Sequence, residues 1–341
     1  MNMPTIDADA HVIETDRTWD YMDEADSKFR PIVVSSHDGK KQFWLVDGRA
    51  TPRGPINTAI PESNREMQDI QSRLRHMDEL GIDIQVLYPT VFLAPLTNRP
   101  EIETALCKSY NRWMADIFRK ADHRLPWIAM LPLMTMDATL AEIQFSKANG
   151  ACGLFARGLV DNKLLSDPYF FPLYEEAGRL GLPVCVHAST GDFDWIDLFQ
   201  RESGFSQFKL PVLIAFHTIV YKEIPQKFPS LRFGFIEVKA QWVPYLIHEL
   251  ARRFKGRGKS PVENIMRDNR LYVACQTDDD LSYVLKYSGE DNLVIGTDYG
   301  HSDTSSEIEA LRRLRDNSDV SSEVLDKILY DNARALYGLD V

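Results

Sequence analysis

The chain has 341 residues, of which 44% are hydrophobic, and its formal net charge at pH 7 is −11. A chain of this length can bury a large core, and α/β barrels commonly reach about 250 residues or more as one domain. The acidic balance argues against nucleic acids and anionic membranes as partners. We also expect neither a secretory signal nor a membrane span, because the sequence has no basic and apolar leader and no run of about 18 apolar residues.

The cysteines are widely spaced and form no CxxC pair: Cys107, Cys152, Cys185 and Cys275. Cys152, Cys185 and Cys275 lie in apolar runs, which favours buried free thiols. This cysteine usage is typical of a reducing compartment, so we expect a cytoplasmic protein.

Short strand-like runs alternate with longer helical patterns along the chain. The first run is "IDADAHVIE" at residues 6–14, and the others lie at 82–90, 125–133, 151–159, 182–189, 231–238, 271–277 and 292–300. The helical stretch before 82–90 ends on Gly81, as a helix C-terminus commonly does. Eight strands separated by helices predict parallel pairing with helical crossovers. The expected fold is therefore α/β, a (β/α)8 barrel (a TIM barrel) rather than an open sheet.

Residues 15–64 do not follow this repeat. They contain a predicted small hairpin at 40–54, followed by a loop rich in Pro, Asn and Ser. We interpret this segment as an insertion after the first strand that lies as a lid over the C-terminal mouth of the barrel, where barrel enzymes keep their sites. Near the end of the chain, 306–317 and 321–339 predict two C-terminal helices. Residues 1–341 are expected to form a single domain.

Ionisable side chains stand near the C-terminal ends of five predicted strands: Asp9 and His11, Arg157, His187, Glu237, and Asp298 with His301 shortly after it. Taken alone, each has an ordinary explanation, such as a helix cap or a hydrogen-bonded histidine. Together, the carboxylates and imidazoles of the first, fifth and eighth strands form a metal-ligand pattern. Such a mixture of oxygen and nitrogen donors suits Zn²⁺ or Mn²⁺ rather than Ca²⁺. The predicted ligands are Asp9, His11, His187 and Asp298.

Asp7 precedes these ligands on the first strand. Alternate residues of a strand share a face, so Asp7 points the same way as Asp9 and His11. It lies about 6.6 Å deeper along the strand. We therefore expect Asp7 to be a buried, hydrogen-bonded support rather than a ligand.

Four further residues have two open interpretations each. Arg157 could pair with a substrate carboxylate through both of its terminal nitrogens, or with a neighbouring carboxylate of the chain. His301 could contact the substrate or orient Asp298, or it could be a surface loop residue. Trp195 and Phe43 could form aromatic walls of a substrate site or belong to the core. The long acidic and aromatic loop at 189–205 could cover the substrate.

Five segments carry a resemblance to a known family: "IDADAHVIE", "FPLYEEAGRLGLPVCVH", "KFPSLRFGFIEVKAQWVPYL", "VIGTDYGH" and "KILYDNARALYGL". From residue 6 to about residue 339, the chain resembles the amidohydrolase-related family, whose best-understood branch contains aminocarboxymuconate-semialdehyde decarboxylase and the metal-dependent aromatic acid decarboxylases. The resemblance implies a distorted (β/α)8 barrel with one divalent metal ion, Zn²⁺ or Mn²⁺, at its mouth. It also implies a small carboxylate-bearing substrate, usually decarboxylation, and a homodimer.

The family motifs map onto single positions of this chain. The first-strand motif, His-x-His or Glu-x-His in the family, matches Asp9 and His11. The histidine of the fifth strand matches His187, and the aspartate of the eighth strand matches Asp298. Glu237 stands where decarboxylases of the family typically carry a histidine that acts as a general acid or base.

This departure leaves the reaction open. The family favours decarboxylation of a small aromatic or unsaturated acid, with Asp298, Glu237 and His301 as catalytic residues. Glu237 instead of histidine favours a hydrolase in which a carboxylate accepts the proton of a metal-bound water. A third possibility is a barrel that only binds a small molecule, because Asp9 replaces the first histidine ligand. Metal content distinguishes this last possibility from the two enzymes.

Overall fold

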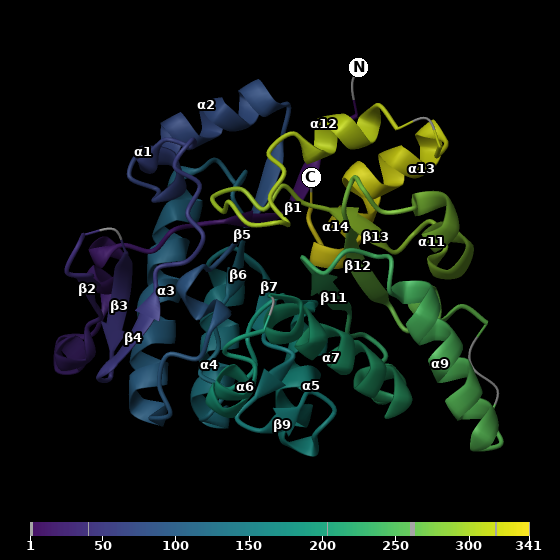
Figure 1. The fold of residues 1–341 in the computed structure, drawn as a ribbon, viewed down its shortest axis with the longest axis horizontal. Coiled ribbons are helices and arrows are strands. Elements are labelled where there is room, and N and C mark those ends of the chain that lie inside the picture. The colour runs from purple at the N-terminus through teal and green to yellow at the C-terminus, as the bar shows by residue number, and fades with distance from the viewer. Residues whose placement is uncertain (1–2, 40, 203, 260–262, 318, 341) are drawn as a thin grey trace.

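The computed structural model describes residues 3–39, 41–202, 204–259, 263–317 and 319–340. Within these ranges, eight parallel strands form one sheet in the order β1-β5-β6-β7-β10-β11-β12-β13 (Figure 1). The strands are β1 (Ile6–His11), β5 (Ile84–Tyr88), β6 (Trp127–Ala129), β7 (Ala151–Ala156), β10 (Val184–His187), β11 (Phe233–Ile236), β12 (Leu271–Cys275) and β13 (Leu293–Ile295). Each lies within one of the predicted runs, so the predicted order of eight strands is confirmed.

The sheet closes between its first and last strands. Beyond β13, the Asp298 N–H donates to the Asp9 carbonyl oxygen over 2.9 Å, and the His11 N–H donates to the Tyr299 carbonyl oxygen over 2.7 Å. Gly296 lies at this seam, where an added Cβ would be 2.3 Å from the Cβ of Asp9. Only glycine permits such a close approach of the two backbones. The closure confirms the predicted barrel and places the ends of the first and eighth strands side by side.

Helices follow the strands and cover the outside of the barrel (Figure 1). The crossover helices are α2 (Ile70–Leu80), α3 (Pro100–Lys120), α4 (Met136–Ala148), α5 (Phe171–Leu180), α7 (Leu210–Tyr221), α9 (Val243–Gly256) and α11 (Leu281–Ser288). Short helices are α6 (Phe193–Leu198), α8 (Ile224–Lys227) and α10 (Ile265–Asp268). At the end of the chain, α12 (Ala310–Arg315), α13 (Ser322–Asp326) and α14 (Asn332–Tyr337) correspond to the predicted C-terminal helices. Apolar side chains of the strands and of the inner helix faces form one continuous core.

The segment 15–64 folds mainly as a small antiparallel sheet. Its strands are β2 (Ile32–Ser35), β3 (Gln42–Val46) and β4 (Arg49–Pro52), with the 3₁₀ helices η1 (Asp16–Tyr21) and η2 (Glu24–Phe29) before them and α1 (Glu62–Arg65) after them. The predicted hairpin is present as β3 and β4, although residue 40 lies outside the described residues, and β2 adds a third strand that the sequence pattern did not reveal. Tyr21 of η1 donates to Asp116 of α3, so this part packs against the side of the barrel.

The end of the same segment reaches the barrel mouth. The Asn57 N–H donates to the Gly300 carbonyl oxygen over 2.8 Å, and the Ser302 N–H donates to the Pro55 carbonyl oxygen over 2.7 Å. Residues 55–57 therefore hold the loop that follows β13 and carries His301. Residues 55–57 of the segment therefore border the site, while its beginning lies beside α3.

Two predictions about chemistry and environment can be compared with this fold. All four cysteines are buried and free, which confirms the prediction for Cys152, Cys185 and Cys275. Among the described residues, none of the helices combines the length and apolar character that crossing a lipid bilayer requires.

Candidate metal centre

The two predicted histidine ligands present the same ring nitrogen to the barrel mouth. His11 Nδ1 lies 2.9 Å from the Pro89 carbonyl oxygen, and His187 Nδ1 lies 3.0 Å from the Ala188 carbonyl oxygen. A carbonyl oxygen can only accept, so each Nδ1 carries a hydrogen, and in a neutral ring each Nε2 then carries a lone pair. Burial, followed by the charge of nearby His301, lowers the pKa of His11 to about 4. His11 is therefore a neutral ring with a free lone pair near pH 7.

Both Nε2 atoms face carboxylates. His187 Nε2 lies 3.2 Å from Asp9 Oδ1, and His11 Nε2 lies 3.4 Å from Asp9 Oδ1 and 3.4 Å from Asp298 Oδ1. None of these four side chains belongs to a residue that is more than 3% exposed. A nitrogen lone pair and a carboxylate oxygen repel each other at such distances unless a proton or a cation lies between them. The structure thus brings all four predicted ligands together in a dry cluster that favours a positive charge.

Several buried polar atoms of the cluster lack a hydrogen-bond partner, which fits a metal ion. His11 Nε2, Asp298 Oδ1 and His301 Nδ1 are buried and have no hydrogen-bond partner among the described residues. Ligand atoms within 4.8 Å of one another occur in two overlapping groups: Asp9, His11, His187 and Glu237 in one, and His11, Asp298 and His301 in the other. Nitrogen and oxygen ligands of one ion at about 2.0 to 2.2 Å are at most about 4.4 Å apart, so small side-chain adjustments suffice. The donor set suits a divalent ion.

Two residues of the cluster have an unusual backbone conformation. Glu237, directly after β11, has a φ of +63°, and Asp298, after β13, has a φ of +52°. Such values cost about 1 to 3 kcal/mol for residues other than glycine, and they cluster at functional sites. The strain is retained at the positions where the two side chains enter the cluster, which supports a role for both beyond packing.

His301 is buried and lies on the ring of His11, with ring centroids 3.9 Å apart. Thr90 Oγ1 donates to the Val12 carbonyl oxygen over 2.7 Å, so in its 2.9 Å contact with His301 Nε2 the histidine is the donor. The other ring nitrogen, Nδ1, lies 2.8 Å from Asp298 Oδ1 without hydrogen-bond geometry. Burial opposes protonation of His301, but the interactions with Asp298, together with the charges of Asp303 and Asp9, outweigh it and raise the pKa of His301. His301 is therefore part of the cluster and not a surface residue.

Glu237 borders the cluster on the side of His187. Its Oε2 atom lies 3.5 Å from His187 Nδ1. Burial, and then the charges of Asp298 and Asp9, raise the pKa of Glu237 well above its usual value. Glu237, Asp298 and Asp303 form a further group of closely spaced acidic atoms. The geometry places Glu237 within reach of whatever binds at the centre, as either a ligand or an acid-base group.

The layer beneath the cluster is fully hydrogen-bonded. Asp7 is completely buried, and its carboxylate accepts from the Thr297 N–H over 2.9 Å, from Thr297 Oγ1 over 2.6 Å and from Gln85 Nε2 over 2.9 Å. Gln85 in turn accepts from Arg73 Nε over 2.8 Å. Asp7 therefore ties the seam between β1 and the end of β13, as a support beneath the predicted ligands.

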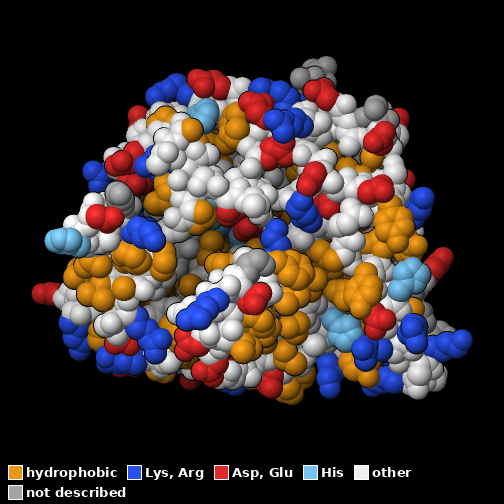
Figure 2. All heavy atoms as spheres, in the orientation of Figure 1, with side chains coloured by type: hydrophobic (Ala, Val, Ile, Leu, Met, Phe, Trp, Pro, Cys, Tyr) orange, Lys and Arg blue, Asp and Glu red, His pale blue; other side chains and the backbone are white. Residues whose placement is uncertain are grey.

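The predicted substrate residues are distributed differently. Arg157 lines a cavity of about 290 Å³ beside the mouth. Trp195 lies on α6, and its Nε1 donates to the Ser206 carbonyl oxygen over 3.2 Å. Phe43 lies on β3 opposite Pro52, which lines a second cavity of about 500 Å³. Trp195 and Phe43 are not among the described residues that line these two cavities. The roles of all three in substrate binding stay predictions. Figure 2 shows the hollowed face of the molecule.

Sequence reasoning missed two residues that hold the cluster. Thr90 fixes the orientation of His301, and Glu14 accepts hydrogen bonds from the backbone N–H groups of Thr90 and Val91, each over 3.0 Å. Burial raises the pKa of Glu14 to about 7. Both residues stand at the ends of predicted strand-like runs, which is the signal that could have found them. A hydroxyl is less conspicuous at a strand end than an ionisable group, and Glu14 lies past the end of β1.

Comparison with known proteins agrees with this geometry. A sequence model of the amidohydrolase family matches residues 6–339. The chain is 21% identical over 351 residues to 2-amino-3-carboxymuconate-6-semialdehyde decarboxylase of Dictyostelium discoideum, and the alignment covers 98% of this chain and 92% of that protein.

Solved structures share the fold. An amidohydrolase from Mycobacterium avium subsp. paratuberculosis superposes with a TM-score of 0.81 at 20% identity, covering 100% of this chain and 99% of that one. A 5-carboxyvanillate decarboxylase from Novosphingobium aromaticivorans, complexed with manganese and 4-hydroxy-3-methoxy-5-nitrobenzoic acid, has a TM-score of 0.65 at 19% identity, covering 82% of this chain and 85% of that one. With the family model spanning nearly its whole length, the chain belongs to the amidohydrolase family and is an enzyme built on that family's barrel.

Proposed function

We propose that this enzyme is a divalent-metal-dependent decarboxylase, a C–C lyase acting on a small aromatic or unsaturated carboxylic acid. The observation that carries the proposal is the pair of Nε2 atoms, of His11 and His187, that face the buried carboxylates. Among the described residues, His11 Nε2 and Asp298 Oδ1 have no hydrogen-bond partner. The similarity to two decarboxylases supports the choice of reaction.

In this proposal Asp9, His11, His187 and Asp298 hold one divalent ion, Zn²⁺ or Mn²⁺. When bound, the ion supplies Lewis acidity that stabilises negative charge on substrate oxygens. The two carboxylates make the donor set richer in oxygen than a site with three histidines, which favours Mn²⁺ more than such a site does. The manganese in the Novosphingobium decarboxylase is consistent with this preference.

The chain's own residues supply the proton chemistry. Decarboxylation breaks the bond between the carboxylate carbon and the neighbouring carbon, which keeps the electron pair and must then receive a proton. His301, with Nδ1 beside Asp298 and Nε2 donating to Thr90, is placed to hold such a proton. Glu237, beside His187, is the second acid-base candidate. Asp298 orients His301, and all three are our proposed catalytic residues.

A hydrolase is the alternative, and Glu237 is the observation that favours it. A largely buried carboxylate beside His187 is a natural acceptor for a proton from water, and it occupies the position where related decarboxylases typically carry histidine. In this case the same ligands would serve hydrolysis of a C–N, C–O or C–C bond.

Incubation of purified, metal-loaded enzyme with a panel of hydroxybenzoic and dicarboxylic aromatic acids decides between the two reactions. The proposal predicts release of CO₂ in a one-to-one ratio with substrate consumed, and no release by the Asp298→Asn variant. Consumption of a substrate without CO₂ contradicts the decarboxylase and supports the hydrolase.

Several further features belong to the same proposal. We infer one domain for residues 1–341, with 15–64 as an insertion that covers bound substrate as a lid. Its residues 49–52, 54 and 55 line the second cavity. Arg157, Trp195 and Phe43 are proposed substrate contacts. A cytoplasmic homodimer is the expected state, and light scattering of the purified protein tests the dimer.

A further inference from the structure

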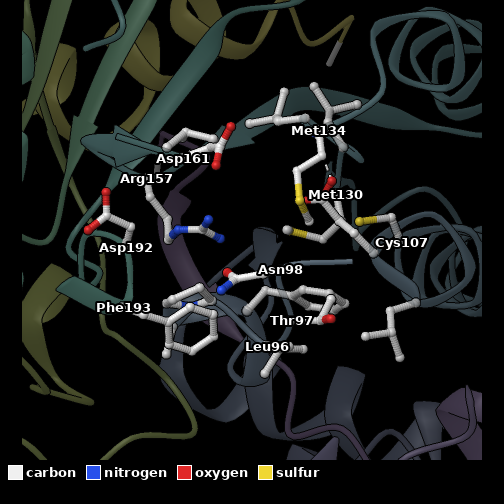
Figure 3. Close-up of a pocket in the computed structure, with 18 of the residues that line it drawn as sticks. Leu96, Thr97, Asn98, Cys107, Met130, Met134, Arg157, Asp161, Asp192 and Phe193 are labelled. Carbon is white, nitrogen blue, oxygen red and sulfur yellow. Dashed lines mark hydrogen bonds between the residues drawn. The ribbon is translucent and has the colours of Figure 1, made fainter. Parts of the chain in front are cut away.

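Arg157 lies at the rim of the barrel. It follows β7, and its Nε atom is buried and has no hydrogen-bond partner in the part of the chain that the structure describes. Within the same part, no carboxylate oxygen forms an ion pair with it at 4.0 Å or less. Figure 3 shows its guanidinium group extending toward the centre of a cavity, with Asn98 to one side and Met130 across from it. A desolvated guanidinium in such a position has room for an oxyanion of a ligand.

Of the four carboxylates that line this cavity, Asp194 is exposed, and the other three are engaged elsewhere. Glu103 accepts from the Met134 N–H over 2.8 Å, and Asp161 pairs with Lys163 Nζ at 2.6 Å. Asp192 accepts from the Trp195 N–H over 3.1 Å as the N-cap of α6, and from the Asn162 N–H over 2.9 Å. Burial raises the pKa of Glu103 to about 7, which further weakens it as a counter-charge near neutral pH. Arg157 is thus left for a ligand.

The cavity adjoins the metal centre. In the pairing of β7 with β10, Ala156 lies opposite Val186, so Arg157 and His187 are the next residues along two strands about 4.8 Å apart. Phe155 lines the cavity, and its ring lies 6.0 Å from the His187 ring, measured between centroids. The rest of the wall is largely apolar and includes Leu96, Leu106, Met130, Leu133 and Met134.

We propose that this side pocket binds a second carboxylate of the substrate through Arg157, while the reacting carboxylate lies at the metal centre. The largely apolar lining of the side pocket fits a flat or short apolar spacer, so the substrate class is a small dicarboxylic acid with an aromatic or unsaturated spacer. The inference rests on the proposed function for the position of the reacting group, but the Arg157 subsite stands on its own geometry.

Calorimetric titration with isophthalate and benzoate tests the subsite without catalysis. For Mn²⁺-loaded protein, we expect isophthalate to bind at least about tenfold more tightly than benzoate, because it gains a charge-assisted, two-point contact with Arg157. Arg157→Met, which keeps length but removes charge, abolishes this preference. Arg157→Lys retains part of it, because lysine offers charge without the planar fork. The matched control is Arg99→Met, which removes an exposed charge already paired with Asp47 and Glu101 and leaves the preference intact.

The same titrations on EDTA-treated protein separate the two proposals. Without metal, benzoate is expected to bind weakly through its single carboxylate, and Arg157→Met should remove this binding. If the protein holds no metal at all, the titration of EDTA-treated protein still tests whether Arg157 binds a carboxylate. An isophthalate preference that survives in Arg157→Met, or absence of the preference in the loaded wild type, overturns the side-pocket proposal. Should Arg157→Met fail to fold, as judged by its melting temperature, Arg157→Lys decides.

Discussion

Two neighbouring layers of side chains inside the barrel differ in how their buried charged groups are hydrogen-bonded. In the lower layer, both carboxylate oxygens of Asp7 accept hydrogen bonds from Thr297, Gln85 and the backbone. In the upper layer, two residues further along β1, Asp9 Oδ1 faces the Nε2 atoms of His11 and His187. The degree of burial is the same, but the upper layer leaves His11 Nε2 and Asp298 Oδ1 without a hydrogen-bond partner among the described residues.

The difference separates structural burial from functional burial. A buried carboxylate that accepts four hydrogen bonds stabilises the place where the barrel closes. Buried acceptors that face each other are unfavourable in the fold alone, and they are retained where a cation balances them. The positive φ angles of Glu237 and Asp298 belong to the upper layer as well. Predictions can therefore be made for each layer separately.

The largest expected effect is on catalysis in the upper layer. Asp298→Asn removes a proposed ligand and the partner of His301, so we expect turnover to fall by more than about 100-fold, beyond the usual loss for outer-shell partners. The metal-free variant should melt no lower than metal-free wild type, because it relieves repulsion between buried acceptors. Differential scanning fluorimetry with and without Mn²⁺ measures this, and Mn²⁺ should raise the melting temperature of the wild type only. The control is Asp291→Asn, an exposed residue paired with Lys327 just before the start of β13. Equal turnover of Asp298→Asn and wild type would remove Asp298 from the site.

In the lower layer, the expected effect is on stability. Asp7→Asn places an amide N–H₂ among groups that all donate, so we expect the free energy of unfolding to fall by about 2 to 4 kcal/mol. Urea unfolding of metal-free protein measures this. The folded fraction of the variant should still bind as many metal ions per chain as wild type. A stability within about 0.5 kcal/mol of wild type would show that this layer is not the support described.

A moderate effect is expected where the layers meet the loop that carries His301. Thr90→Val keeps the shape but removes the hydroxyl that accepts from His301 Nε2. We expect kcat to fall by about 10-fold to 100-fold with little change in KM, since the hydroxyl positions the acid and does not bind substrate. Thr139→Val, which removes another buried hydroxyl bonded only to Pro132, is the control. An unchanged kcat in Thr90→Val contradicts the assignment.

The smallest effect concerns Glu103 in the side pocket, where burial raises the pKa to about 7 against attraction from Arg157. A raised carboxyl pKa stabilises the fold fully below the unfolded value of about 4.5 and loses that contribution as pH rises through about 7. Compared with Glu103→Gln, wild type should therefore lose stability between pH 4.5 and pH 8. Urea unfolding across this pH range checks it. Parallel profiles for the two proteins would show that Glu103 does not titrate in this range.

Much of the fold could be predicted from the sequence, because alternation of short apolar runs with helical patterns is a local signal. The clustering of the four proposed ligand residues could be predicted for the same reason, since a strand end in a barrel has a known place in space. The third strand of the insertion could not be found, because the run Ile32–Ser35 is short and half exposed. The sequence also could not show that one part of the insertion packs against α3 while another part borders the mouth, because both positions depend on long-range contacts.

The burial and the partners of single side chains could not be predicted from the sequence either. Whether His301 is buried depends on Thr90, a residue 211 positions away. Whether Arg157 has a partner depends on carboxylates that the loops direct elsewhere. The sequence left both interpretations open for each residue, and only packing distinguishes them.

Metal content is the measurement that tests the central claim most directly. Elemental analysis of gently purified protein, with Asp298→Asn alongside, should give about one Zn²⁺ or Mn²⁺ per wild-type chain and far less in the variant. Less than about 0.1 metal ion per wild-type chain, with no gain after addition of Zn²⁺ or Mn²⁺, would contradict the account of the upper layer as a metal centre.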